Sequence, residues 1–183
     1  MKARKLDKTL KWLDRQGRYV VSLMQMRTLF PDDAEAALLK GVQRAVKDGT
    51  LILLTSGIYL NPAATSNDGK TLEWVARLMR NAPLEYSYIS LESALAAYGL
   101  ISQIPVDRIT VMTTGRKGEI KTPYGTVEFT HTSRPLSEVL KSFKYMQQGD
   151  VLPMATSQAA IRDLRRTGRN LHLLLDHEEL GDE

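Results

Sequence analysis

The placement of glycine and proline in the first 62 residues limits this region to short structural elements. Gly17, Pro31 and Gly49 each follow a segment in which apolar residues recur with helical spacing, and both residue types commonly end helices. The segments that they delimit predict three short helices, at 6–16, 23–30 and 34–47.

Individual residues support each of these helices. Leu6, Leu10 and Leu13 recur at i, i+4 and i+7 on the first helix. Ser22 directly precedes the second helix and is a suitable N-cap. An acidic pair at 32–33 precedes the third, where negative charge interacts favourably with the helix dipole.

Two β-prone segments follow the third helix. Residues 50–54 (TLILL) and 58–60 (IYL) are separated by Thr55-Ser56-Gly57, which has the composition of a turn. Three short helices followed by a hairpin is the order of a winged helix-turn-helix, whose third helix enters the major groove of DNA. We therefore expect residues 1–62 to form a DNA-binding domain of this kind.

The charge distribution favours polyanion binding by the same region. Residues 1–62 carry 11 Lys and Arg against 6 Asp and Glu, whereas residues 63–183 carry 14 against 15. The tail at 176–183 (DHEELGDE) holds five acids and no Lys or Arg. An excess of basic residues indicates a polyanionic partner, although a solvated basic surface is the alternative.

The chain has no cysteine, which excludes disulfides, thiolate metal sites and a cysteine nucleophile. No apolar stretch approaches the ~20 residues that a membrane span requires. The N-terminal sequence MKARKLDKTLKWL lacks the apolar core of a signal peptide. We expect a cytoplasmic protein without a membrane partner.

The remainder predicts a second domain. Residues 63–70 (AATSNDGK) are expected to form a linker to a domain at 71–183. Its strands are predicted to form a short antiparallel meander, with Val127 and Phe129 facing the core and Glu128 facing solvent. Four further helices are expected, at 71–80, at 91–98 with Ser90 as N-cap, at 136–143, and within 154–166. The predicted fold class is therefore α+β.

The third helix carries the strongest candidates for DNA contact. Lys40, Gln43, Arg44 and Lys47 share one face because they lie at i, i+3, i+4 and i+7. Arg can pair with guanine and Gln with adenine, while Lys suits phosphate. Weaker candidates are the hydroxyls of the hairpin turn and a basic N-terminal arm, which could reach an adjacent groove or simply fray: Thr55, Ser56, Lys5 and Lys8.

Basic residues also gather late in the chain. Four arginines fall within eight residues, more than the dipole of one helix C-terminus requires: Arg162, Arg165, Arg166 and Arg169. Arg116 and Lys117 lie in a turn of the predicted sheet. We interpret both groups as a candidate surface for a nucleic acid or an acidic partner.

The sequence predicts no enzyme, no metal and no cofactor. His131 is expected at a strand end and His172 and His177 at the surface, without metal-ligand spacing. One pattern leaves a metal-dependent nuclease open, since Asp107 is followed at strand distance by Glu119-Ile120-Lys121. Such triples occur often by chance.

Five stretches of this chain resemble the AbiEi-type antitoxins of bacterial type IV toxin–antitoxin systems and follow the same order. They are TLILLTSGIYLNP, YISLESALAAYGLI, RITVMTTGRKG, TPYGTVEFTH and MATSQAAIRDLRRTGR. The resemblance extends over about Leu10 to Arg169, although Ser157 and Gln158 stand where the family usually has Pro and Glu.

The resemblance implies an autorepressor of its own operon in a phage-defence (abortive infection) system. Its C-terminal domain would counteract a nucleotidyltransferase-like toxin. A monomer or weak dimer is expected, with two copies on the half-sites of an inverted-repeat operator. Two alternatives remain open, namely a winged-helix transcription factor whose second domain dimerises or senses a ligand, and the nuclease.

Overall fold

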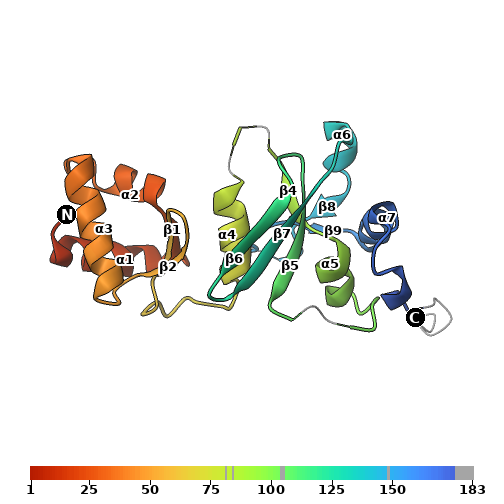
Figure 1. Cartoon of the computed structure of the whole chain (residues 1–183), viewed down its shortest axis with the longest axis horizontal. Coiled ribbons are helices and arrows are strands. Elements are labelled where there is room, and N and C mark those ends of the chain that lie inside the picture. Colours follow the sequence, from red (N-terminus) through yellow and green to blue (C-terminus); the bar gives the residue numbers. More distant parts are fainter. Residues whose placement is uncertain (81, 84, 104–105, 148, 176–183) are drawn as a thin grey trace. The chain divides into compact units, whose positions relative to one another are not determined.

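The computed structural model describes residues 1–80, 82–83, 85–103, 106–147 and 149–175. They form two compact units, one of residues 1–78 with 122–124 and the other of the described residues in 79–121 and 125–175 (Figure 1). The predicted linker, 63–70, falls inside the first unit. Both units combine helices with sheet, so the α+β class is confirmed.

The first unit contains the three helices and the hairpin at the predicted positions. A three-stranded antiparallel sheet joins them in the order β1-β3-β2, with Val21 and Leu53 on either side of Tyr59. In chain order the elements are α1 (Ala3–Asp14), β1 (Val20–Ser22), α2 (Leu23–Leu29), α3 (Glu35–Lys47), β2 (Ile52–Thr55), β3 (Ile58–Leu60) and α4 (Thr71–Met79).

Ser22 ends β1 and starts α2 without an intervening loop. Its hydroxyl accepts a hydrogen bond from the Gln25 amide at 3.2 Å, and the Gln25 side chain accepts one from the Ser22 amide at 2.9 Å. This reciprocal capping satisfies two backbone donors that a helix N-terminus otherwise leaves unpaired. The predicted N-cap is confirmed.

The core of the first unit lies between α1, α2 and α3. Each helix contributes the apolar residues that recur with helical spacing, and each of these is nearly inaccessible to solvent. The buried cluster consists of Leu6, Leu10, Leu13, Val21, Met26, Phe30, Leu38, Val42, Ala45 and Leu51. Burial of these faces leaves the opposite, polar side of α3 exposed.

The second unit is built on a mixed sheet. Among the described residues it has six strands in the order β6-β7-β5-β4-β9-β8. Helix α5 packs against β5 and α7. The elements are β4 (Ser87–Ile89), α5 (Leu91–Ala97), β5 (Arg108–Thr113), β6 (Gly118–Thr122), β7 (Gly125–His131), α6 (Leu136–Val139), β8 (Phe143–Lys144), β9 (Met154–Ala155), α7 (Ser157–Thr167) and the 3₁₀ helix η1 (Leu171–Leu173).

The predicted antiparallel meander is wrong. Strands β5 and β7 are parallel neighbours over their whole length, from Arg108↔Thr126 to Thr113↔His131. The four residues 114–117 can span ~13 Å, more than the ~9.6 Å across two strand spacings. The chain therefore passes over one strand position, and the β6–β7 hairpin returns to fill it.

Two local predictions also fail because polar residues lie inside the second unit. Glu128 is only 9% exposed instead of facing solvent, since arginines cover it. Ser90 is fully buried and makes no side-chain cap to α5. Its hydroxyl donates to Asp163 at 2.8 Å instead.

The helix predicted at 136–143 is shorter than expected. α6 covers four residues, because Phe143 and Lys144 form the edge strand β8. The helix expected within 154–166 is present as α7, and the strand β9 directly before it pairs with β4 and β8. Thr156 then caps α7 by accepting a hydrogen bond from the Ala159 amide at 3.2 Å. Here a β-prone segment and a helical segment follow each other with no glycine or proline between them. The sequence therefore does not show where one element ends and the next begins.

Candidate nucleic-acid and partner interfaces

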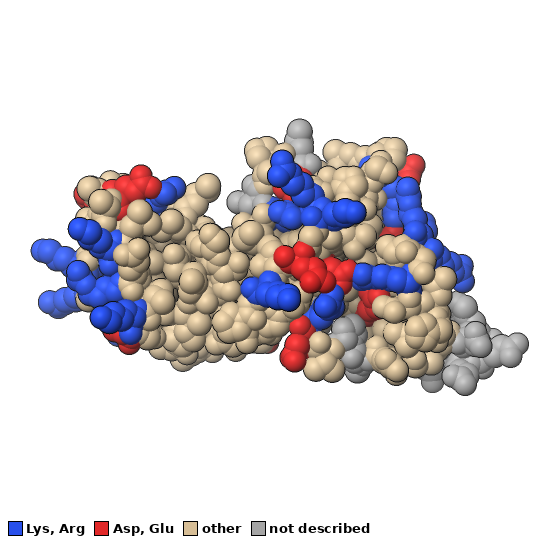
Figure 2. Space-filling view, in the orientation of Figure 1, with Lys and Arg blue, Asp and Glu red and all other residues tan. Residues whose placement is uncertain are grey.

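Helix α3 exposes all four residues predicted to contact DNA. Leu38, Val42 and Ala45 are 1–2% exposed and fix the rotation of the helix. The exposed residues on the other side are Lys40, Gln43, Arg44 and Lys47. Lys and Arg side chains gather over α3 and the start of α1 in Figure 2. Within the described part of the chain, neither Lys40 nor Lys47 has an ion pair with a carboxylate.

Asp48 follows this basic face and remains charged at neutral pH. Its carboxylate accepts hydrogen bonds from the Thr50 hydroxyl at 2.6 Å and the Thr50 amide at 3.0 Å. These bonds, and to a smaller extent the charge of Arg44, lower the pKa of Asp48. The carboxylate is therefore held toward the loop after α3, and the Arg44 guanidinium has no hydrogen bond to it among the described residues.

Gly41 allows the N-terminus to lie directly on α3. A Cβ atom at this position would be 2.9 Å from the Cβ of Met1, which is closer than real Cβ contacts. The Met1 ammonium pairs with Asp33 at 3.2 Å. Next to this contact, a groove of about 310 Å³ is lined by Arg4, Arg44 and neighbouring residues. Asp7 and Asp48 also line this groove, so the edge that the two helices share carries both signs of charge.

The basic N-terminal arm is instead part of a helix. α1 begins at Ala3, so Lys5 and Lys8 lie on an ordered element that is anchored by its leucines. Lys5 lies over the ring of Phe30 at 5.3 Å and is 3.8 Å from Asp32. Lys8 is exposed. The sequence signal was the leucine period itself, which extends the amphipathic pattern into the basic segment.

The hairpin turn offers only neutral groups. Ser56 is exposed, and Thr55 is half-buried beside a register shift in β2. Gly57 has a φ of +71°, which favours glycine, and its carbonyl accepts a hydrogen bond from the Leu23 amide at 2.7 Å. This bond fixes the turn against the start of α2.

The predicted linker is hydrogen-bonded within the first unit. The Asp14 carboxylate accepts bonds from the amides of Thr65 and Ser66 at 3.0 and 2.9 Å. Hydrogen bonds from Ser66, then Thr65, hold the pKa of Asp14 well below its usual range. Tyr19 donates to Asp68 at 2.8 Å. The composition of 63–70 is typical of a linker, but these contacts attach it to α1 and to the residue before β1.

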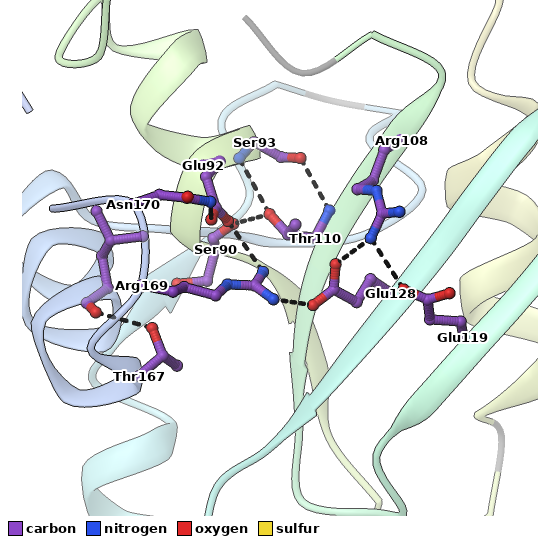
Figure 3. Close-up of polar contacts among 11 residues, drawn as sticks. Ser90, Glu92, Ser93, Arg108, Thr110, Glu119, Glu128, Thr167, Arg169 and Asn170 are labelled. Carbon is purple, nitrogen blue, oxygen red and sulfur yellow. Dashed lines mark hydrogen bonds and ion pairs between the residues drawn. The ribbon is translucent and has the colours of Figure 1, made fainter. Parts of the chain in front are cut away.

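The second unit contains a chain of ion pairs that the sequence did not predict. Figure 3 shows Arg169 between Glu92 and Glu128, and Arg108 between Glu128 and Glu119. Burial raises the pKa of Glu128, but the bonds from Arg169 and Arg108 outweigh it and the net shift is downward. These contacts join α5, β5, β6 and β7 to the segment after α7.

A cavity of about 380 Å³ adjoins this chain of ion pairs. Its lining includes Gln103, Val106 and Leu173 in addition to the charged residues. The described non-glycine residues with positive φ all belong to its wall or adjoin it, namely Leu91, Asp107 and Asn170. Backbone strain of this kind persists only where the surroundings enforce it, and it is concentrated at functional sites.

The four late arginines divide into two groups. Arg169 is engaged by Glu92 and Glu128, with its side chain 35% exposed. Arg162, Arg165 and Arg166 are exposed on α7, as are Arg116 and Lys117 in the turn between β5 and β6. The structure therefore leaves five of the six predicted partner-surface residues at the solvent.

The sequence also did not predict a buried polar cluster centred on a residue of α7. Asp163 is fully buried and accepts bonds from Arg134, from Ser90 at 2.8 Å and from Tyr88 at 3.2 Å. Ser142 accepts bonds from Arg134 at 3.3 Å and from Arg162 at 2.8 Å. The available signal was an acidic residue within the apolar stripe of α7, between Ala160 and Leu164.

The residues of the nuclease hypothesis are engaged differently from a metal site. Glu119 pairs with Arg108 at 3.0 Å, and Asp107 is exposed in a strained backbone conformation. In the described ranges no group of three or more His, Asp or Glu could hold a metal ion. His131 ends β7 and its Nδ1 lies 2.7 Å from the Gly115 carbonyl, while His172 lies in η1. His177 and the acidic tail lie outside the described residues.

Comparison with known proteins identifies a structure with a similar fold. No protein-family model and no curated protein sequence matches this chain. The crystal structure of the RV2827C protein from Mycobacterium tuberculosis is similar, with a TM-score of 0.51 and 18% identity. The match covers 88% of this chain and 60% of that one, and at this identity it shows the fold alone. In the part of the chain that is described, no helix is long and apolar enough to cross a membrane.

Proposed function

We propose that this chain is a DNA-binding transcriptional autoregulator and an antitoxin of the AbiEi type, acting in the cytoplasm as part of a phage-defence system. The carrying observation is the exposed basic face of α3 within the first unit. The order α1-β1-α2-α3-β2-β3, with a sheet in which β3 is central, matches a winged helix-turn-helix. The resemblance of the sequence to the antitoxin family supports the same function.

The geometry of α3 suits a reading helix. Its 13 residues extend over about 20 Å, enough to lie in a major groove. Gln43 and Arg44 would meet base edges, while Lys40 and Lys47 would pair with phosphates. The exposed Lys8 on α1 and the hydroxyls of the hairpin turn add contacts at the edges of this surface. Burial of Leu38, Val42 and Ala45 holds all four reading residues at one rotation.

Specific repression requires two copies of the chain on one operator. A single short helix contacts too few base pairs to select one site in a genome. An inverted repeat presents two half-sites to two identical reading helices about one helical turn apart. A monomer or weak dimer in solution would therefore assemble on the operator.

The second unit would counteract a nucleotidyltransferase-like toxin. The exposed cations of this unit form the candidate surface for the toxin or its target: Arg116, Lys117, Arg162, Arg165 and Arg166. Arg169 is assigned to the fold because two glutamates engage it. No catalytic role is proposed for this unit.

Two variants that each remove three positive charges test whether the first unit binds DNA and the second unit counteracts the toxin. K40A/R44A/K47A should lose binding to the promoter of its own operon, yet it should protect cells from the toxin when expressed from an unrelated promoter. R116A/K117A/R165A removes the same charge from the second unit and should keep DNA binding while protection falls. Loss of protection in the folded, fully expressed α3 variant would contradict the proposal.

The cavity of the second unit favours one further candidate function. A ligand-sensing regulator would use this cavity, with its strained residues and paired arginines, to bind an effector. In that case R116A/K117A/R165A would leave cell survival unchanged, and an effector would alter the affinity for DNA. The identity of the neighbouring gene separates the two candidates, because an antitoxin requires a toxin gene beside it.

A further inference from the structure

One group of arginines in the second unit has more positive charge than its carboxylates can neutralise. Arg134 lies on the connection after β7, and Arg162 and Arg166 lie one turn apart on α7. The facing groups of opposite charge are Asp163 and, more distantly, Glu138. Arg165 on the same helix is exposed as well.

The Ser142 hydroxyl holds two of these guanidinium groups side by side. It accepts hydrogen bonds from Arg134 at 3.3 Å and from Arg162 at 2.8 Å, so the two donor nitrogens lie within about 6 Å of each other. Ser142 is 2% exposed, and its own proton goes to the Glu138 carbonyl at 2.8 Å. A buried hydroxyl therefore positions two like charges that repel each other.

Asp163 cannot balance the whole group. One of its oxygens accepts from Arg134 and lies 3.8 Å from Arg162, and the other accepts from Ser90 and Tyr88. The carboxylate thus accepts three hydrogen bonds and supplies one negative charge to two guanidinium groups. The guanidinium of Arg166 has no ion pair among the described residues, although its charge acts on Arg134.

The surplus of positive charge also affects the pKa of Arg134. Burial lowers the pKa of this guanidinium, Tyr88 opposes the shift, and the charges of Arg162 and Arg166 lower it further. Its Nε is buried without a hydrogen-bond partner in the described structure. The side chain is thus paired with Asp163 and still lies in a positive field.

The helix dipole explains only part of this arrangement. Basic side chains in the last turn of α7 are favourable to its C-terminus, which accounts for Arg165 and Arg166. It does not account for Arg162, which lies earlier on the helix, or for Arg134, which comes from another element. Figure 2 shows the basic side chains gathered over α7.

We infer that Arg162, which Ser142 holds beside Arg134, and Arg166, one turn further along α7, bind a phosphate group. Planar guanidinium donors match several phosphate oxygens at once, and the multiple negative charge of phosphate balances the surplus that a single carboxylate would leave. This site deepens the proposed partner surface. It depends on the proposed function for its biological role, whereas binding itself depends only on the cluster.

Titration of the full chain with pyrophosphate, at constant ionic strength, tests the inference. The wild type should bind, and R162A/R166A should bind about tenfold more weakly or worse, because two charge-assisted interactions are lost. R166A alone should weaken binding with unchanged thermal unfolding, since this side chain makes no hydrogen bond within the described structure. R18A/K121A removes the same charge at exposed positions outside the cluster and outside the proposed partner surface, and it should bind like the wild type.

Equal affinity in the wild type and both α7 variants, or no binding by the wild type, would overturn the inference. Where the wild type binds, competition with a ten-nucleotide single-stranded RNA distinguishes two sources of the phosphate group. This competition is measured in the K40A/R44A/K47A background, which removes the α3 face. Competition identifies a polynucleotide backbone, and its absence identifies a free phosphate compound. Because this background lacks the DNA-reading residues, failure of the phosphate site is distinguishable from failure of the proposed DNA binding.

Discussion

The two units differ in whether arginine takes part in the fold. On α3 the cations stand at the solvent, and the fold is held by an apolar cluster that does not involve them. In the second unit Arg134 and Arg169 reach into the fold and satisfy carboxylates that are nearly buried. Exposed charges contribute little to folding and are available to a ligand, whereas buried pairs are expensive to break. Net charge alone does not distinguish these two cases.

The buried pair at Asp163 provides the largest test of this comparison. We expect D163N to destabilise the second unit by about 3–5 kcal/mol, because the buried Arg134 would lose its counter-charge. Urea unfolding followed by circular dichroism measures this change. K40A/R44A/K47A should shift the midpoint by less than about 0.5 kcal/mol. Similar destabilisation in both variants would remove the contrast between the units.

A second test uses pH. The pKa of Glu128 is lowered in the fold, so its contribution to stability is present above the ordinary glutamate pKa of about 4.5 and is lost as the pH falls through the folded value. E128Q should cost about 1–3 kcal/mol at pH 7 and should flatten the loss of stability in acid. Unfolding curves between pH 3 and pH 7 measure both effects. An unchanged acid slope in E128Q would show that other carboxylates dominate.

The helix caps should contribute equally to the stability of the two units. The difference between the units would then lie only in their charged residues. Ser22 caps α2 and Thr156 caps α7, each through one backbone amide at 3.2 Å. S22A and T156A should each cost about 1 kcal/mol. Thermal unfolding of the two variants, compared side by side, provides the measurement. A loss several times larger at one cap would mean that the units differ in more than their charges.

The smallest expected effect concerns the nuclease alternative. D107A/E119A should leave DNA binding and protection unchanged, because Asp107 is exposed and Glu119 is one of two carboxylates on Arg108. Its stability should change by no more than about 0.5 kcal/mol, as for other surface positions. The assay incubates duplex DNA and Mg²⁺ or Mn²⁺ with the wild type or with this variant and measures cleavage of the DNA. Cleavage that disappears in this variant would establish the nuclease function instead.

The local sequence pattern was sufficient to predict an element where one face of that element is apolar. The leucine period of α1, the Ser22 cap and the spacing on α3 predicted the elements of the first unit and the exposure of its basic residues. Pattern failed in the second unit, where strand order depends on pairing between distant segments. Glu128 alternates correctly with Val127 and Phe129, yet Arg169, 41 residues later, covers it. Long-range ion pairs leave no period in a sequence, so the partners of Asp163 and Glu92 were not predictable.

The salt dependence of DNA binding tests the central claim most directly. Affinity for duplex DNA from the promoter of this operon should fall steeply with salt, with a slope of about −0.9 in log K against log salt for each phosphate contact. K40A/R44A/K47A should bind more weakly and with a shallower slope, while R116A/K117A/R165A should keep the wild-type slope. Identical slopes and affinities in the wild type and the α3 variant would contradict the assignment of α3 as the DNA-reading helix.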